Sequence, residues 1–451
     1  MRLFQLTTRI LMAAMAGLLF FTSCVKNENI NYSESKTQQL KNLTNDLAVQ
    51  WMNLSMTLTK ETPGFTSPVA ARSYAYISLA MYELIVPGMS NYRSMQGVLQ
   101  GFDKGSMKNP NSYGEISWEA SLNECMYQLF QKMYINTTPQ AKAEIDNLYN
   151  KLQSGLLEQY GADVLNNSKN YGADKAHAIF NYSVSDGQSE AYLNNYISSI
   201  TTPNREGIWS PSVNSNKNPL QPKWGDVRTF VKHSSEEMQM VSPPEFSDEK
   251  TSSFYSYALE VRNRAENLNY SDEIMVKYWN DDNEGDITPS GHMLAILCQN
   301  LQIENKDLGF AVFAMMRLAT VMHDATVAAW KTKYTYYTMR PETYIRQYID
   351  NEFLSLSNAS STPEYSSGQA AVAAAAAEVL GSLFGYNYAF TDRTYEYRKD
   401  IDGSPRAYQS YQDMAEEVLN SNLLGGIHYR FSLEAGQKQG IEIAKNYNAI
   451  R

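Results

Sequence analysis

Apolar side chains recur at the three- to four-residue spacing of helices along most of this chain, and runs with the two-residue alternation of strands are scarce. Helical segments are predicted at residues 43–58, 67–86, 115–134, 139–160, 248–279, 290–301, 308–330, 370–380 and 427–446. The alanine-rich segment 370–380 must pack closely against its neighbours, and we expect Gly381 to end or interrupt it. The sequence therefore predicts an all-α fold, a helical bundle with elaborated loops.

A chain of 451 residues suggests two or three domains, or one large helical body with additions. Residues 201–244 contain six prolines, a density that breaks regular structure and marks a long connecting segment. We therefore predict an N-terminal helical region at 39–200 and a C-terminal helical bundle at 245–451.

The N-terminus has the pattern of an export signal. Arg2 and Arg9 precede an almost wholly apolar run at residues 10–21. This run is too short to span a bilayer as a stable helix. Small residues then lead to Cys24, as at a bacterial lipoprotein cleavage site. This pattern predicts a signal peptide at 1–23, an acylated Cys24 and a tether at 24–38, with the protein anchored to the bacterial outer membrane in the cell envelope. The alternative is a plain secretory signal with an incidental cysteine.

Charge and cysteine content exclude several classes of function. The formal net charge is −10, and the absence of a basic cluster argues against a nucleic-acid partner. Cys125 and Cys298 are expected to be buried free thiols, with a disulfide between them as the alternative. The sequence shows no Cys/His spacing typical of zinc sites.

Three segments after residue 330 carry residues that could bind one anion. Lys333 and Arg340 are seven apart, so a helix would place both on one face. Ser366 or Ser367 can cap the alanine-rich helix, whose free amides and positive dipole end attract anions, and Gly368 permits close approach. Each segment also has an ordinary interpretation, as solvated charges or a capped helix.

The third segment runs from Ser421 through a glycine pair to His428, which could act as a nucleophile or as a ligand of a metal oxyanion. Taken alone, such a histidine is more often structural. Together, the three segments resemble the superfamily of type 2 phosphatidic acid phosphatases and vanadium-dependent haloperoxidases. That pattern is Lys, six residues, Arg-Pro; then Pro-Ser-Gly-His; then Ser-Arg, five residues, His. The resemblance covers about residues 290–451.

The resemblance implies a role for each matching residue. His428 would attack phosphorus or bind vanadium. The equatorial oxygens of a phosphate or vanadate ion would be held by Lys333, Arg340, Ser367 and the Gly368 amide. The implied fold is the helical bundle of the haloperoxidase and acid phosphatase type, with an added N-terminal helical region. The implied partner is a small phosphate-like anion or a phosphoester.

The departures from the family pattern imply an impaired site. Gln369 replaces the second histidine, which would be the general acid–base, and Asn422 replaces the second arginine. Ser432 stands where the family usually has an aspartate that would orient the imidazole, which serine can do only weakly. Ser366 replaces the proline of the second motif.

Two other histidines are set aside. Residues 289–292 spell Pro-Ser-Gly-His but precede Lys333, against the family order. We expect His292 to pack and cap its helix, with a place near the site as the alternative. His323 and Asp324 are expected to be structural.

The function that the sequence favours is an exported, lipid-anchored phosphatase- or haloperoxidase-like protein that binds phosphate or vanadate. Whether it turns over is left open; phosphomonoester hydrolysis is favoured over halide oxidation, because a good leaving group needs no acid. The alternative is a non-catalytic surface lipoprotein that binds glycan or peptide. Convergence of Lys333, Arg340, Ser367 and His428 on one pocket distinguishes the two.

Overall fold

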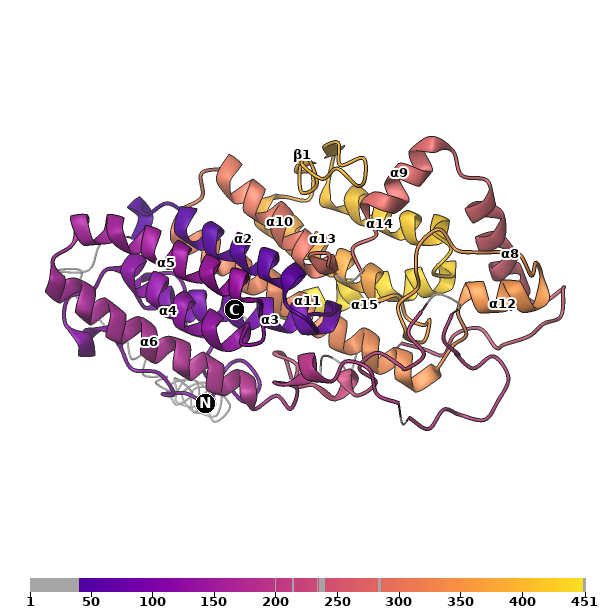
Figure 1. Ribbon diagram of the computed structural model, residues 1–451, viewed down its shortest axis with the longest axis horizontal. Helices are drawn as coiled ribbons and strands as arrows, with labels where there is room; N and C mark the ends of the chain where they lie inside the picture. Colours follow the sequence, from indigo (N-terminus) through magenta and orange to yellow (C-terminus); the bar gives the residue numbers. More distant parts are fainter. Residues whose placement is uncertain are drawn as a thin grey trace, which may run out of the picture. The chain divides into compact units, whose positions relative to one another are not determined.

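A long apolar helix, α11 (Leu308–Tyr336), runs through the core of the protein (Figure 1). The computed structural model describes residues 40–448 apart from 199, 213, 214, 233, 235–239, 283 and 284. Cys24 and the predicted signal and tether lie outside these residues. The helix α11 is long and apolar enough to cross a membrane, but 83% of its most apolar window is buried, as in the core helix of a globular body.

The described residues form an all-α fold, as predicted. The helices besides α11 are α2 (Asp46–Glu61), α3 (Ser67–Ile85), α4 (Trp118–Met133), α5 (Pro139–Gln159), α6 (Ala162–Val184), α8 (Ser253–Glu266), α9 (Tyr270–Tyr278), α10 (Thr288–Ile303), α12 (Pro341–Tyr348), α13 (Gly368–Phe384), α14 (Tyr411–Leu424) and α15 (Arg430–Asn448). Two short antiparallel strands, β1 (Phe390–Asp392) and β2 (Arg406–Tyr408), pair Phe390 with Tyr408.

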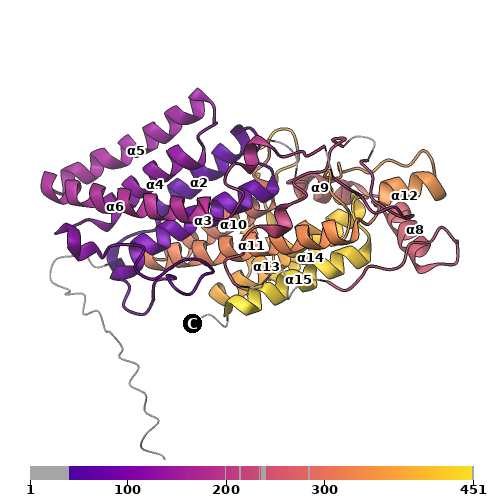
Figure 2. The ribbon, with the colours of Figure 1, turned by 90° about the horizontal axis from the view of Figure 1, so that it is seen from below.

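Most of the helices share one large hydrophobic core, and two of them pack in a second, smaller one. Helices α2 to α6 lie at one end of the molecule, and α8, α9 and α12 lie at the other (Figures 1 and 2). Helix α11 packs against α3 on one side and against α13 and α15 on the other. The larger core contains residues from Leu40 to Tyr447, whereas α8 and α12 pack in a second hydrophobic cluster around Phe254 and Tyr344. The proline-rich segment 201–244 is irregular where it is described and packs its turn Trp224–Asp226 on α11.

Close backbone packing joins α13 to α15. The alanines of α13 are buried, and two glycines of α15 face them. A Cβ added to Gly440 would lie 2.1 Å from the carbonyl oxygen of Ala371, and one added to Gly436 would lie 2.3 Å from that of Ser367. The small residues therefore let the two backbones approach, and the start of α13 is held against α15.

Three local expectations are wrong. The segment 248–279 is not one helix, because Asn269 accepts from the Asp272 amide and starts α9 after a break. Gly381 does not end the alanine-rich helix, which continues to Phe384. The last helix begins at Arg430, three residues later than predicted. In the first and third cases, local polar or glycine-rich chemistry overrides the apolar periodicity.

Candidate oxyanion-binding site

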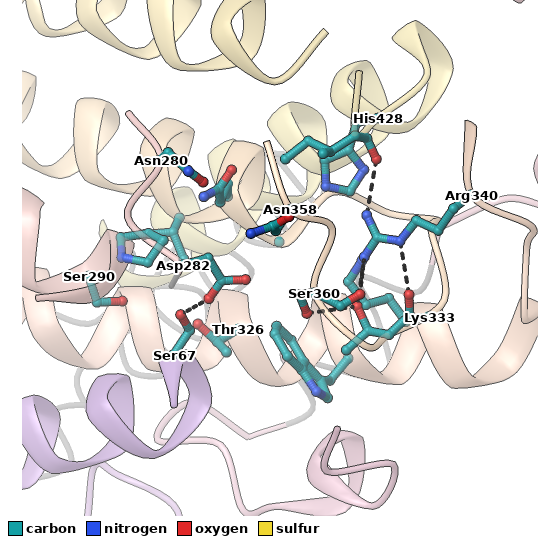
Figure 3. A pocket seen from close by; sticks show the side chains of 17 residues that line it. Ser67, Asn280, Asp282, Ser290, Thr326, Lys333, Arg340, Asn358, Ser360 and His428 are labelled. Carbon is teal, nitrogen blue, oxygen red and sulfur yellow. Dashed lines mark hydrogen bonds between the residues drawn. The ribbon is translucent and has the colours of Figure 1, made fainter. Parts of the chain in front are cut away.

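A cavity lies where α3, α11, α13 and the chain before α15 meet, and it is called the central cavity below (Figure 3). It holds about 590 Å³ of space, part of it open to solvent. Its lining residues are Ser67, Asn280, Asp282, Pro289, Ser290, Thr326, Trp330, Lys333, Arg340, Asn358, Ser360, Thr362, Gly368, Gln369, Val372, Ile427 and His428. Residues from all three sequence segments therefore line one cavity.

Lys333 and Arg340 reach the central cavity from different local structures. Lys333 is in the last turn of α11, which ends at Tyr336 with Tyr337 in a left-handed conformation (φ 51°). Arg340 then lies in extended backbone before Pro341, a residue that disfavours helix at the position preceding it. The prediction of one shared helical face is therefore wrong, although both side chains line the same cavity.

Both cations are buried and hydrogen-bonded to the chain. Lys333 Nζ donates to the carbonyl oxygens of Pro363 (2.9 Å) and Glu364 (3.0 Å). Arg340 donates through Nε to Thr362 O (2.9 Å), through Nη1 to Ile427 O (3.1 Å) and through Nη2 to Ser360 O (3.4 Å) and Thr362 Oγ1 (2.8 Å). These bonds fix the direction of both charges.

Burial and mutual repulsion act on these cations. Burial, and then the neighbouring Arg340, hold the pKa of Lys333 well below its usual range. Burial also lowers the pKa of Arg340, while Glu364 and Asp282 oppose the shift. An anion bound beside these two buried cations would offset the repulsion between them.

The start of α13 forms another wall. Ser367 is the N-cap, because its Oγ accepts from the Ala370 amide (3.3 Å), whereas Ser366 Oγ donates to Gln439 (2.9 Å). Gly368 and Gln369 line the central cavity, but the Ser367 side chain is not among the lining residues. Ser367 therefore acts here as the helix cap, and the helix start itself faces the cavity.

His428 is oriented by a glutamate that the sequence analysis did not single out. Its Nδ1 lies 2.8 Å from Glu364 Oε1, which also accepts from the Tyr429 amide (3.1 Å). Because Oε1 is an acceptor, Nδ1 carries the proton and the Nε2 lone pair is left for a ligand. Burial, Arg340 and Lys333 together hold the pKa of His428 well below its usual range, so the ring is neutral near pH 7.

Ser432 does not orient the imidazole. Its Oγ donates to the carbonyl oxygen of Glu364 (3.3 Å), and its own carbonyl accepts from the Ser367 amide (3.2 Å). It thus ties the Glu364 segment to α15. The orienting role expected at position 432 belongs to Glu364.

Two positions from the third motif turn away from the central cavity. Asn422 Nδ2 and Ser421 Oγ both donate to the carbonyl oxygen of Val418 (2.8 Å each). Neither residue is among those that line the cavity. Gln369 does line it, and its buried Oε1 has no hydrogen-bond partner in the described part of the chain.

His292 is held in a separate buried cluster. Its Nδ1 lies 2.7 Å from Asp281 and its Nε2 lies 2.8 Å from Asp392, and its ring stacks on Trp279. With both nitrogens engaged, His292 has none to offer to the central cavity.

Asp324 has a structural role, as expected: its carboxylate accepts from the amides of Phe230 (2.8 Å) and Val231 (3.0 Å).

Comparison with known proteins agrees with this geometry. The family model of the second helical-bundle domain of VCPO matches residues 312–355 and 349–450. A bacterial vanadium-dependent iodoperoxidase matches with a TM-score of 0.81 and 26% identity, covering 91% of this chain and 97% of that one. The chain belongs to the haloperoxidase and acid phosphatase superfamily.

Two further solved structures share the fold of this chain. The holo-type bacterial vanadium-dependent chloroperoxidase matches with a TM-score of 0.64 and 15% identity, covering 85% of this chain and 91% of that one. The apo-type enzyme matches with a TM-score of 0.61 and 14% identity, covering 85% and 93%. A search of curated proteins gives no significant match.

The sequence analysis missed the residues that the haloperoxidase-type bundle brings to the cavity from outside the three motifs. Ser67, from the start of α3, donates a short hydrogen bond to Asp282. Burial raises the pKa of Asp282, and Arg340 and Lys333 oppose the shift. The acidic loop near residue 280 was visible in the sequence, but nothing in its pattern indicated which tertiary partners it would meet.

Proposed function

We propose that the central cavity binds a tetrahedral oxyanion, phosphate or vanadate. The observation that supports this most directly is the convergence of two buried cations, a neutral histidine and a helix start on one cavity. These groups attract an anion through charge, through the helix dipole and through free amides. A surface for glycan or peptide gives no reason to bury Lys333 and Arg340 together.

The donor set fits such an ion. Lys333 has three N–H groups and gives two to carbonyls, and Arg340 has five and gives four to acceptors in the described chain. One N–H of each remains for oxyanion oxygens. Gly368 keeps the helix start open, since a Cβ there would lie 3.2 Å from the Trp330 ring.

Vanadate would be held by the same residues, with His428 Nε2 directed at the metal. Bound vanadate would supply the peroxide and halide chemistry after which haloperoxidases are named. The role of this chain's residues would be to hold the oxyanion: Glu364 keeps the proton on Nδ1, and the two cations balance the charge of the ion.

We further propose that turnover is weak and is confined to activated phosphomonoesters. His428 Nε2 would attack phosphorus, an N–P bond would form, and the P–O bond to the leaving group would break. Water would then attack phosphorus, so that the N–P bond breaks, phosphate is released and Nε2 is free again. The Gln369 amide is not acidic enough to transfer a proton to the leaving oxygen, so this oxygen must leave as a stable anion. Loss of a general acid typically costs about 10²–10⁴ in rate.

Calorimetry of the purified protein with sodium phosphate and sodium orthovanadate tests the binding proposal. We expect saturable binding by the wild type and a loss of at least about tenfold in affinity in His428→Ala, because the imidazole nitrogen proposed to bind the ion is removed. His177→Ala, at an exposed histidine of α6, serves as the matched control. Equal affinities for the wild type and His428→Ala would remove His428 from the site.

We also propose that Cys24 is acylated and anchors the protein to the outer membrane, as the N-terminal pattern predicts. Cells fed a labelled fatty acid should incorporate label into the wild type and into Cys125→Ala, but not into Cys24→Ala. Label in the Cys24→Ala protein would contradict the anchor.

A further inference from the structure

Asp282 places an acidic group inside a site built for anions. It lies in the chain between α9 and α10 and lines the central cavity with Lys333, Arg340 and His428. Figure 3 shows Asp282 and Ser67 on one side of the cavity and His428 and Arg340 on the other. An oxyanion held by His428 and Arg340 therefore has Asp282 across the cavity from it.

The position of Asp282 is fixed on both sides. Ser67 Oγ donates to its carboxylate from the start of α3. The preceding residue, Asp281, is bound by His292 (2.7 Å) and by the Tyr395 hydroxyl (2.5 Å). The buried His292 cluster thus anchors the loop and keeps Asp282 at the cavity wall.

The chemistry of a fixed carboxylate beside an oxyanion is selective. An ionised carboxylate can only accept hydrogen bonds, so it repels an oxyanion that has no proton. An oxyanion that keeps a proton can donate it to the carboxylate in a charge-assisted hydrogen bond. Phosphate retains such a proton near neutral pH, because its last dissociation occurs only in strong base, whereas sulfate has lost all its protons.

We propose that Asp282 makes the central cavity select tetrahedral oxyanions that carry a proton near neutral pH, such as phosphate and vanadate, over fully ionised ones such as sulfate. This inference rests on the proposed oxyanion-binding function. Lys333, Arg340 and the helix start supply the general attraction for anions. Asp282 supplies the discrimination, since it accepts from the one ligand atom that can donate.

The test is calorimetry at pH 8 with sodium phosphate and sodium sulfate as the two probes. We expect the wild type to bind phosphate at least about tenfold more tightly than sulfate, the effect of one charge-assisted hydrogen bond. Asp282→Asn removes the charge and adds an amide donor at the same size. Its affinity for sulfate should rise and the phosphate preference should fall by at least about tenfold.

The matched control is Asp174→Asn, which removes the same charge from an exposed aspartate of α6 that is paired with Lys108. It should keep the wild-type preference. Should Asp282→Asn fail to fold, the inference is tested by the ratio of phosphate affinity to sulfate affinity. This ratio is measured in the wild type and in Asp282→Glu, which keeps the carboxylate acceptor.

Equal affinities of the wild type for phosphate and sulfate would overturn the inference while leaving the oxyanion site in place. An unchanged preference in Asp282→Asn would do the same. No binding of either ion to the wild type would overturn the proposed function together with the inference.

Discussion

Arg340 makes four hydrogen bonds to other residues of the protein. Its bonds to Thr362, Ser360 and Ile427 tie the loop before α13 to the residue preceding His428. The cost of ordering this guanidinium is therefore met in folding and not at the moment of binding. Preorganised charge of this kind is what gives an oxyanion site its strength.

Replacing Gln369 with histidine should supply the general acid that the proposed function lacks. In Gln369→His, turnover of an alkyl phosphomonoester, which has a poor leaving group, should rise by about 10²-fold or more, because the leaving oxygen can then be protonated. Turnover of p-nitrophenyl phosphate should rise less. Steady-state kinetics with both esters measures the difference.

Gln369→Ala is the control, since it changes the same side chain without supplying a proton. Equal gains for the two esters in Gln369→His would contradict a role in leaving-group protonation. Adding Asn422→Arg tests whether a longer side chain can reach the cavity from a position where asparagine turns back to Val418.

Sequence order and spacing located Lys333, Arg340, Gly368 and His428, because these residues stand within short motifs. Glu364 could have been found, since it lies inside the second segment, but only the fold shows that it meets His428 from 64 residues away. Asp282 could not have been assigned, because its partners come from α3 and α11 and no local pattern predicts them.

At the scale of single elements, helix existence followed from apolar periodicity, whereas helix ends followed from polar chemistry. Asn269 breaks the segment 248–279 through a capping box, which overrides the apolar pattern on both sides. Helix α11 ends at Tyr336, between the two cations, and α12 starts only at Pro341, after Arg340. A spacing of seven residues therefore did not mean two helical turns.

The contact between α13 and α15 should be intolerant of a single methyl group. Gly440→Ala would place a Cβ 2.1 Å from the Ala371 carbonyl oxygen, so the helices must separate. We expect a loss of about 1–3 kcal/mol in the free energy of unfolding, as for other overpacked cores. Denaturant unfolding measures it.

Gly155→Ala is the matched control, because a Cβ at this position of α5 meets nothing within 4 Å. It should stabilise the protein by about 0.5–1 kcal/mol through helix propensity. A neutral Gly440→Ala would show that α15 can move away from α13 without cost.

The His292 cluster should give the protein a stability term that depends on pH. Burial alone would lower the pKa of His292, but Asp281 and Asp392 raise it to about 10. A raised pKa means that the folded state holds a proton that the unfolded chain releases near pH 6.5. The stabilisation is therefore complete below about pH 6.5 and is lost as the pH rises through about 10.

In His292→Gln, the free energy of unfolding should fall by about 3–5 kcal/mol at pH 6.5, because two buried carboxylates lose their partner. The difference from the wild type should shrink steadily towards pH 10. Urea unfolding at several pH values measures it, with His177→Gln on the exposed face of α6 as the control. A difference that does not vary with pH would mean that His292 is neutral.

At the scale of the whole molecule, the central cavity joins parts of the chain that are far apart in sequence. Its walls come from the start of α3, the loop near residue 280, the end of α11, the start of α13 and the chain before α15. The N-terminal helices thus take part in the site through Ser67, although the three motifs all lie after residue 330. An ion bound there would lie between segments that are far apart in the sequence, from Ser67 to His428.

Ligand binding should therefore protect separate stretches of backbone at once. With saturating phosphate, hydrogen–deuterium exchange should slow at residues 280–282 and at the start of α3, as well as at the start of α13 and around His428, because binding reduces local opening. Helix α5 contributes no residue to the central cavity, so its exchange should stay the same. In His428→Ala at the same phosphate concentration, all of these effects should diminish together. Protection limited to α13 and His428 would instead mean that the ion contacts one wall, and that Ser67 and Asp282 lie beyond its reach.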